Sequence, residues 1–152
     1  MFFEEQIKSL GEGKIKIYVD MDGVIADYNV GEARNYHKKR PLIESIKKLE
    51  DVSKLDNVEM HILSVARLNV GAEEKHMWLD EVAPFFKKEN RTIIPREENG
   101  FMAAKDLKLL FIKNLERDGS KIVIIDDDPQ ILHEMQMNYK DLILYKDTVL
   151  VD

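Results

Sequence analysis

The fold is decided by residues 14–23, KIKIYVDMDG, in which a β-branched apolar run ends in two carboxylates and a glycine. A run of this kind predicts a buried strand, because β-branched side chains pack well on a pleated sheet. Five such runs predict strands at 14–20, 58–63, 91–95, 121–126 and 142–145. Amphipathic stretches separate them, so the chain predicts an α/β protein: a Rossmann-like three-layer sandwich whose parallel sheet of about five strands has helices on both faces.

Apolar residues at helical spacing occur between the predicted strands and give the expected helices. These lie around 42–49, 78–82, 107–115 and 131–139. The first ten residues carry Phe3, Ile7 and Leu10 on one face and predict an extra helix. Asp128 before Pro129 is typical of a helix N-cap followed by proline at the first helical position.

Length and composition limit the protein further. With 152 residues and 44% hydrophobic residues, the chain predicts a single domain over 1–152. The absence of cysteine excludes disulfides, thiolate zinc sites and cysteine nucleophiles. A net charge of −6 disfavours general coating of nucleic acid. No apolar run approaches the roughly 20 residues that span a bilayer, and no export signal is visible, so we expect a soluble cytoplasmic protein without membrane partners.

Carboxylates follow two of the predicted strands. Asp20 and Asp22 come after the first, and Asp126, Asp127 and Asp128 come after the fourth. In a parallel sheet the carboxyl ends of strands meet at one edge, where ligands bind, so these acids are expected to converge. Crowded carboxylates repel one another and need a cation, and a set of oxygen ligands suits Mg²⁺. For Asp128 alone, the helix cap is the simpler interpretation.

Two stretches resemble a known family. Residues 20–27, DMDGVIAD, resemble the first motif of the haloacid dehalogenase (HAD) superfamily of phosphohydrolases, and residues 124–129, IIDDDP, resemble its fourth. The residues of the first motif are especially similar to those of the 5'(3')-deoxyribonucleotidase branch. By order along the chain, Ser64 matches the second motif and Lys105 best matches the third, with Lys108 and Lys113 as weaker rivals. The resemblance covers about 14–145 and implies a HAD-like fold.

The resemblance also implies a reaction. Asp20 is expected to attack phosphorus and form an aspartyl-phosphate, and Asp22 to act as general acid and then as base for the hydrolytic water. Ser64 and Lys105 are expected to contact the phosphoryl oxygens. Mg²⁺ is expected to bind Asp20, the backbone carbonyl of Asp22, and Asp126, with Asp127 in support.

For other candidate site residues the sequence allows two interpretations. Arg67 either reaches substrate or is a surface arginine, and the basic run 37–40, HKKR, is either a solvated helix end or a substrate-facing patch. Trp78 is expected in the core, although Lys-x-x-Trp-Leu at 75–79 is similar to a stretch in deoxyribonucleotidase-like proteins. The stretch between the first two motifs is short, so residues 27–40 can form only a minimal cap or lid.

The expected activity is therefore that of a Mg²⁺-dependent phosphomonoesterase acting on a nucleotide or a nucleic-acid terminal phosphate. A phosphatase of another small phosphorylated metabolite is one alternative. Others are a non-catalytic phosphate-binding or regulatory module, and a receiver-like domain phosphorylated on an aspartate. Because the cap is minimal, the sequence is compatible with a partner subunit that supplies the lid, and therefore with a homo-oligomer.

Overall fold

The computed structural model describes residues 2–27 and 35–151. Five parallel strands form one sheet in the order β3-β2-β1-β4-β5. The strands are β1 (Ile15–Val19), β2 (Val58–Ala66), β3 (Arg91–Pro95), β4 (Lys121–Asp126) and β5 (Leu142–Lys146). This confirms the predicted α/β class and the five-stranded parallel sheet.

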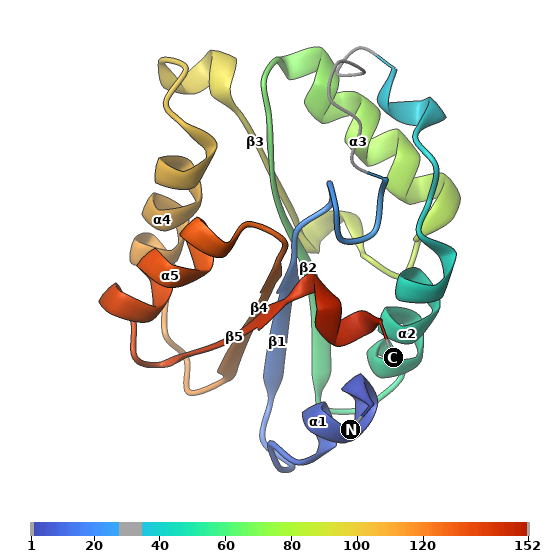
Figure 1. Ribbon diagram of the computed structural model, residues 1–152, viewed down its shortest axis with the longest axis vertical. Coiled ribbons are helices and arrows are strands. Elements are labelled where there is room, and N and C mark those ends of the chain that lie inside the picture. The colour runs from blue at the N-terminus through green and yellow to red at the C-terminus, as the bar shows by residue number, and fades with distance from the viewer. Residues whose placement is uncertain (1, 28–34, 152) are drawn as a thin grey trace.

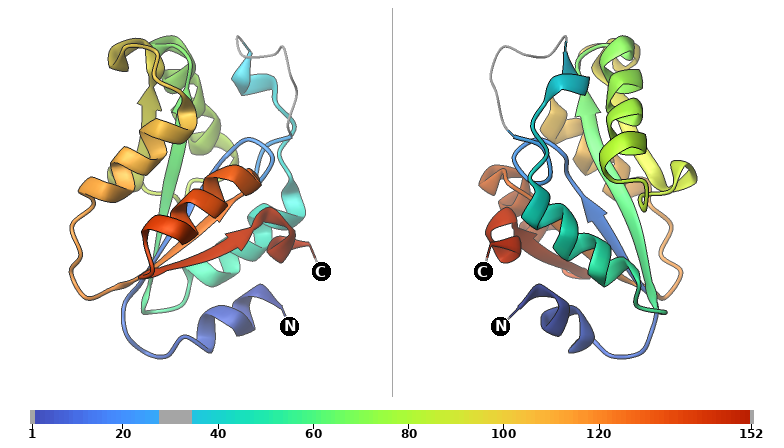
Figure 2. Two further views of the ribbon diagram at one scale, coloured as in Figure 1. Left: turned by 60° about the vertical axis from the view of Figure 1, so that its left-hand side comes forward. Right: turned by 90° about the vertical axis from the view of Figure 1, so that its right-hand side faces the viewer.

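Helices cover both faces of the sheet, as Figure 1 shows. They are α1 (Phe3–Lys8), α2 (Ile43–Ser53), α3 (Asn69–Val82), α4 (Ala104–Asn114) and α5 (Pro129–Asn138). Short 3₁₀ turns lie at Tyr36–Lys38, Lys88–Asn90, Arg96–Asn99 and Asp147–Leu150. The two views of Figure 2 place α4 and α5 on one face, α2 and α3 on the other, and α1 below the amino ends of the strands.

The alternation of side chains along β1 explains the two layers. Ile15, Ile17 and Val19 are fully buried and belong to the larger core cluster, together with Leu49 of α2 and Trp78 of α3. The side chain of Tyr18 points to the other face, where it joins a second cluster with residues of α4 and α5. A strand buried on both sides is the expected consequence of a parallel sheet between two helical layers.

Two strand boundaries differ from the sequence prediction. β1 stops at Val19, so Asp20 begins the following turn. β2 continues to Ala66 because its last residues, Ile62–Ala66, pair with β3 over Arg91–Pro95. Ser64 therefore lies inside a strand rather than at its end. α3 begins at Asn69, well before the predicted segment 78–82.

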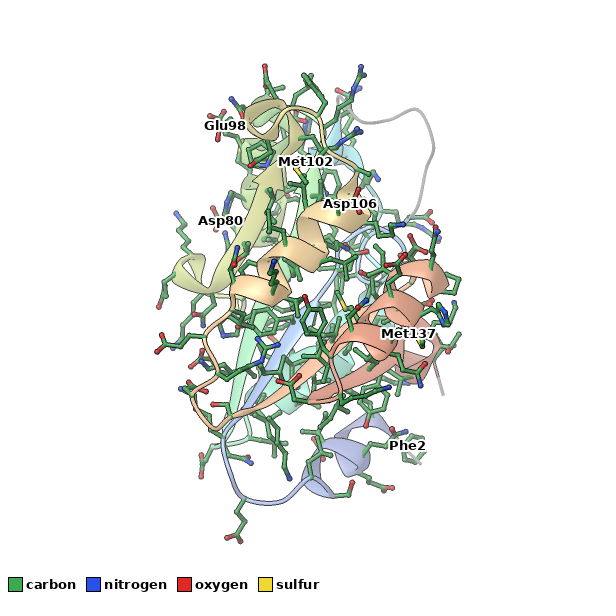
Figure 3. All side chains as sticks on the ribbon, turned by 90° about the vertical axis from the view of Figure 1, so that its left-hand side faces the viewer. Phe2, Asp80, Glu98, Met102, Asp106 and Met137 are labelled. Carbon is green, nitrogen blue, oxygen red and sulfur yellow. The ribbon has the colours of Figure 1, made fainter. Side chains whose placement is uncertain are left out.

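The N-terminal helix and the Asp128 cap are both present. Phe3 and Ile7 of α1 are buried in the larger core cluster, and Phe2 beside them points outward (Figure 3). The Asp128 carboxylate accepts a hydrogen bond from the Gln130 N–H at 2.9 Å, at the start of α5.

Within the described residues no helix has both the length and the apolar character that crossing a bilayer requires.

The central strand gives the first prediction. Ile17→Ala should lower the free energy of unfolding by about 2–5 kcal/mol, because it leaves a cavity in the core between β1 and α2. Ile43→Ala, at a residue 67% exposed on α2, should change it by less than about 0.5 kcal/mol. Urea denaturation of both variants measures the difference; equal losses would contradict the assignment of Ile17 to the core.

Candidate active site

The carboxyl ends of β1 and β4 bring the predicted acids together. Val19 pairs with Ile125, and the Asp20 N–H continues the ladder by donating to the Ile125 carbonyl at 3.0 Å. Asp20 therefore lies beside Asp126, the last residue of β4. Asp126 is buried at this edge of the sheet, and the Asp20 side chain is 12% exposed there. The edge lies at the upper end of β1 in Figure 1.

Asp20, Asp126 and Asp127 form a compact cluster in which one oxygen from each carboxylate lies within 4.8 Å of the others. Burial, with repulsion from Asp126, raises the pKa of Asp20 to about 7 and that of Asp127 to about 6. Raised pKa values mean that both carboxyl groups bind a proton more readily than they would in water. A set of three carboxylate oxygens fits a hard cation such as Mg²⁺.

The lysine that enters this cluster is Lys108, not Lys105. Its ammonium lies 2.7 Å from Asp126 Oδ2 and 3.0 Å from Asp20 Oδ1, and its side chain is buried. Burial lowers the pKa of Lys108, but the two carboxylates outweigh it, so the pKa lies above its ordinary value. The ammonium offsets part of the negative charge of the acid cluster.

The structure gives Lys105 a partner outside the acid cluster, and its phosphate contact stays a prediction. Lys105 lies in the first turn of α4, where its ammonium pairs with Glu134 of α5 at 3.2 Å. The rotation of α4 is set by Leu107 and Ile112, which are buried. Lys108 shares a helix face with Ile112 one turn later, so it points toward the sheet edge. Lys113, the other rival, belongs to the last turn, away from that edge.

A tight turn after β1 shapes the other side of the cluster. The Met21 carbonyl accepts hydrogen bonds from the N–H groups of Val24, Ile25 and Ala26. Gly23 has a φ of +81°, a conformation that favours glycine. A Cβ on Gly23 would lie 2.0 Å from Asp127 Oδ2. The absence of a side chain at Gly23 is therefore what allows Asp127 to pack against the turn.

Asp22 projects from the same turn into a separate ion-pair group. Its Oδ1 lies 2.7 Å from Lys39 Nζ, and its Oδ2 lies 3.2 Å from Lys75 Nζ. Burial raises the pKa of Asp22, but the two lysines outweigh it and leave the pKa below its ordinary value. Asp22 is thus held as a carboxylate, in contrast to Asp20.

Ser64 lies on β2, next to β1, and its side chain is buried. Its hydroxyl oxygen accepts a hydrogen bond from Lys75 Nζ at 2.8 Å. The same ammonium therefore contacts both Ser64 and Asp22. By resemblance, Ser64 matches the second motif, and Asp22 is the second aspartate of the first motif. Lys75 is buried, and this burial lowers its pKa against the opposing effect of Asp22.

The basic run at 37–40 contributes one residue to the site. Lys39 is 8% exposed and reaches Asp22, whereas Arg40 is exposed and pairs with Asp27. Trp78 holds the segment in place, because its indole N–H donates to the Lys39 carbonyl at 3.0 Å. Trp78 is therefore a core residue, as predicted. Of the expected lid at 27–40, residues 28–34 lie outside the described residues.

Arg67 lies just beyond β2 and is exposed. Its backbone carbonyl accepts from the Glu97 N–H, but its guanidinium has no hydrogen-bond or ion-pair partner in the part of the chain that the structure describes. The structure thus leaves Arg67 outside the group formed by Asp20, Asp22, Ser64 and the buried lysines.

Two site residues, Lys39 and Lys75, were not predicted as such. Lys39 belonged to a basic run with two interpretations, and Lys75 to the Lys-x-x-Trp-Leu stretch. The available signal for Lys75 was its spacing from Trp78 and Leu79, since these three are the buried residues of α3. A lysine in phase with the apolar face of a helix indicates a buried cation.

Comparison with known proteins gives no family for the chain. No protein-family model matches it, and a search of the curated proteins finds no match.

The Gly23 turn gives the second prediction. Gly23→Ala should destabilise the fold and weaken Mg²⁺ binding at least about tenfold, because the added Cβ displaces Asp127 and strains the turn. Gly13→Ala is the matched control, since a Cβ there meets nothing within 4 Å. Isothermal titration with Mg²⁺ and thermal melts measure both effects; wild-type Mg²⁺ affinity in Gly23→Ala would contradict the packing of Asp127.

The raised pKa of Asp127 gives the third prediction. In the folded state this pKa is about 6, against an ordinary value of 3.8, so between these pH values the folded protein binds more protons than the unfolded one. Wild type should therefore lose stability relative to Asp127→Asn as pH rises from about 4 to about 7 without metal. Thermal melts of both proteins in EDTA across this pH range measure the difference in stability. A difference in Tm that does not change with pH would contradict the raised pKa of Asp127. Added Mg²⁺ should stabilise wild type more than the variant at pH 7.

Proposed function

We propose that the protein is a Mg²⁺-dependent phosphomonoesterase of HAD type that acts through an aspartyl-phosphate on Asp20. The observation that carries this proposal is the arrangement around Asp20: one carboxylate oxygen contacts Lys108, and the carboxylates of Asp126 and Asp127 lie beside it. A nucleophile, a cation site and a fixed positive charge at one sheet edge are the parts that phosphoryl transfer needs. The order of the motif residues along the chain, Asp20, Asp22, Ser64, Lys108 and Asp126, supports the same family.

Asp20, Asp126 and Asp127, with the Asp22 carbonyl, would hold Mg²⁺, which would supply charge stabilisation for the phosphoryl oxygens. Lys108 opposes the effect of burial on Asp20, although the pKa of Asp20 stays raised at about 7, and a cation at the cluster would favour the ionised form further. An ionised Asp20 is the form that attacks phosphorus.

The reaction of this chain has two steps. In the first, an Asp20 oxygen forms a bond to phosphorus while the ester P–O bond breaks, and the leaving oxygen takes a proton from the Asp22 carboxyl. In the second, the Asp22 carboxylate takes a proton from water, whose oxygen attacks phosphorus and releases phosphate and free Asp20. Ser64 and Lys108 donate hydrogen bonds to the phosphoryl oxygens.

Asp22 is held by Lys39 and Lys75 in the form that the second step requires, a carboxylate. To serve as acid in the first step it must carry a proton, so its contacts with the lysines have to loosen when a dianionic phosphate enters. The phosphate itself offers the lysines an alternative anionic partner, so their ammonium groups keep an anion beside them when the contacts with Asp22 loosen.

The substrate part of the proposal is a nucleotide or a nucleic-acid terminal phosphate. It rests on the similarity of residues 20–27 to deoxyribonucleotidases, and the short stretch between the motifs favours a bulky phosphorylated group over a fully enclosed one. Free mononucleotides, sugar phosphates and 3'-phosphorylated oligonucleotides are the substrates to compare.

The fourth prediction concerns Asp20. Wild type should hydrolyse p-nitrophenyl phosphate with Mg²⁺ and lose this activity in EDTA. Asp20→Asn should lower kcat by about 10³-fold or more, because the amide cannot form the phospho-intermediate. Asp51→Asn, at an exposed acid of α2, should retain wild-type kcat.

Three outcomes would contradict the proposal in different ways. A folded wild type that is inert toward all the phosphate esters but binds Mg²⁺ and phosphate indicates a regulatory or binding module. A stable phosphoprotein after acetyl phosphate treatment indicates a receiver-like domain. Full activity in Asp20→Asn would exclude Asp20 as the nucleophile.

A further inference from the structure

Lys75 occupies the middle of α3 and is 4% exposed. Its ammonium makes three short contacts: 2.8 Å to Ser64 Oγ, 2.9 Å to the Val65 carbonyl and 3.2 Å to Asp22 Oδ2. A lysine ammonium has three N–H donors, so all of them are used. The three acceptors come from two different segments, β2 and the turn after β1.

The packing of α3 directs this side chain to the sheet edge. Trp78 and Leu79 are buried three and four residues after Lys75, so all three share one helix face. A Cβ on Gly71 would lie 3.7 Å from the Ala66 side chain, so the first turn of α3 packs closely on the end of β2. The rotation and position of the helix therefore hold Lys75 against Ser64.

The contact with Ser64 has a direct chemical consequence. A hydroxyl group has one donor and two acceptor sites, and an ammonium cannot accept a hydrogen bond. Because Lys75 donates to the Ser64 oxygen, the Ser64 hydrogen must point toward another acceptor. An incoming phosphoryl oxygen is such an acceptor, so the contact with Lys75 prepares the hydroxyl as a donor.

The contact with Asp22 extends the same effect to a second group. Asp22 Oδ2 lies against Lys75, while Oδ1 lies against Lys39, which comes from a different segment. Among the described residues Lys39 makes no hydrogen bond to Ser64. Lys75 is therefore the one described side chain that joins Ser64 to Asp22. A buried cation costs considerable free energy to desolvate, which a purely structural contact on this helix face would not require.

From these contacts we infer that Lys75 is a positioning residue of the phosphate site, which orients the Ser64 hydroxyl as a phosphate donor and holds the Asp22 carboxylate beside it. This inference rests on the proposed function for its catalytic consequence. Its consequence for binding is independent of turnover: wild type should bind phosphate more tightly than a variant without Lys75.

The kinetic test is a double-mutant cycle on p-nitrophenyl phosphate with Lys75→Met, Ser64→Ala and the double variant. Lys75→Met should lower kcat/KM about 10- to 100-fold, with a rise in KM, because the phosphate donor is no longer oriented. The double variant should be clearly less impaired than the product of the two single effects. Lys16→Met is the matched control, since Lys16 lies at the other end of β1 and pairs with Asp118.

The binding test uses inorganic phosphate and Mg²⁺ in isothermal titration. Lys75→Met should weaken phosphate binding in the presence of Mg²⁺ about tenfold and leave Mg²⁺ binding alone within about twofold, because Lys75 contacts none of the three clustered acids. Lys75→Gln, whose amide can still donate to Ser64, should fall between wild type and Lys75→Met in both tests.

The outcomes separate this inference from the proposed function. An inactive wild type that binds phosphate less well once Lys75 is removed would overturn the phosphatase and support the positioning role. An active wild type with unchanged kcat/KM and phosphate affinity in Lys75→Met would overturn the positioning role alone, as would fully multiplicative effects in the cycle. Failure of both Lys75→Met and Lys75→Gln to fold would show that Lys75 serves the fold instead.

Discussion

The ion pairs of Lys108 with Asp20 and Asp126 are the interaction on which the rest of the site depends. Two neighbouring parallel strands end in carboxylates, and their pairing puts these groups side by side whatever the electrostatic cost. Burial, together with repulsion from Asp126, accordingly raises the pKa of Asp20 to about 7. One buried ammonium offsets part of this cost, and a divalent cation bound to Asp20, Asp126 and Asp127 would offset the remainder. A sheet edge with this charge arrangement is prepared for an anionic ligand only when the cation is present.

The two helical layers each contribute a lysine to the same edge. Lys108 comes from α4 on one face of the sheet and Lys75 from α3 on the other (Figures 1 and 2). They serve different members of the first motif: Lys108 pairs with Asp20 and Lys75 with Asp22. Burial dominates at Asp20 and the two lysines dominate at Asp22, so the pKa of Asp20 lies above its ordinary value and that of Asp22 below it. For the proposed reaction these preferences have to reverse: a cation at Asp20 would favour the carboxylate that attacks, and loss of the lysine contacts would let Asp22 hold a proton.

The strands and the acid cluster were predictable from the sequence because both depend on local patterns. Apolar β-branched runs indicate buried strands, and acids at the ends of adjacent parallel strands must meet. The lysines were harder, because the choice between Lys105 and Lys108 depends on how α4 rotates when Leu107 and Ile112 pack. Lys39 and Lys75 reach Asp22 only through tertiary contacts, such as the hydrogen bond from Trp78 to the Lys39 carbonyl. Charged residues within a basic run or an amphipathic helix are usually solvated, so composition alone gives no reason to place them in a site.

We expect Asp20, Asp126 and Asp127 to share one divalent cation. The most direct measurement is the anomalous scattering of crystals soaked with Mn²⁺, which takes the same oxygen ligands as Mg²⁺. The account predicts one strong peak within coordination distance of an oxygen from each of the three carboxylates. A peak at other residues, or no peak there at a saturating Mn²⁺ concentration, would contradict it.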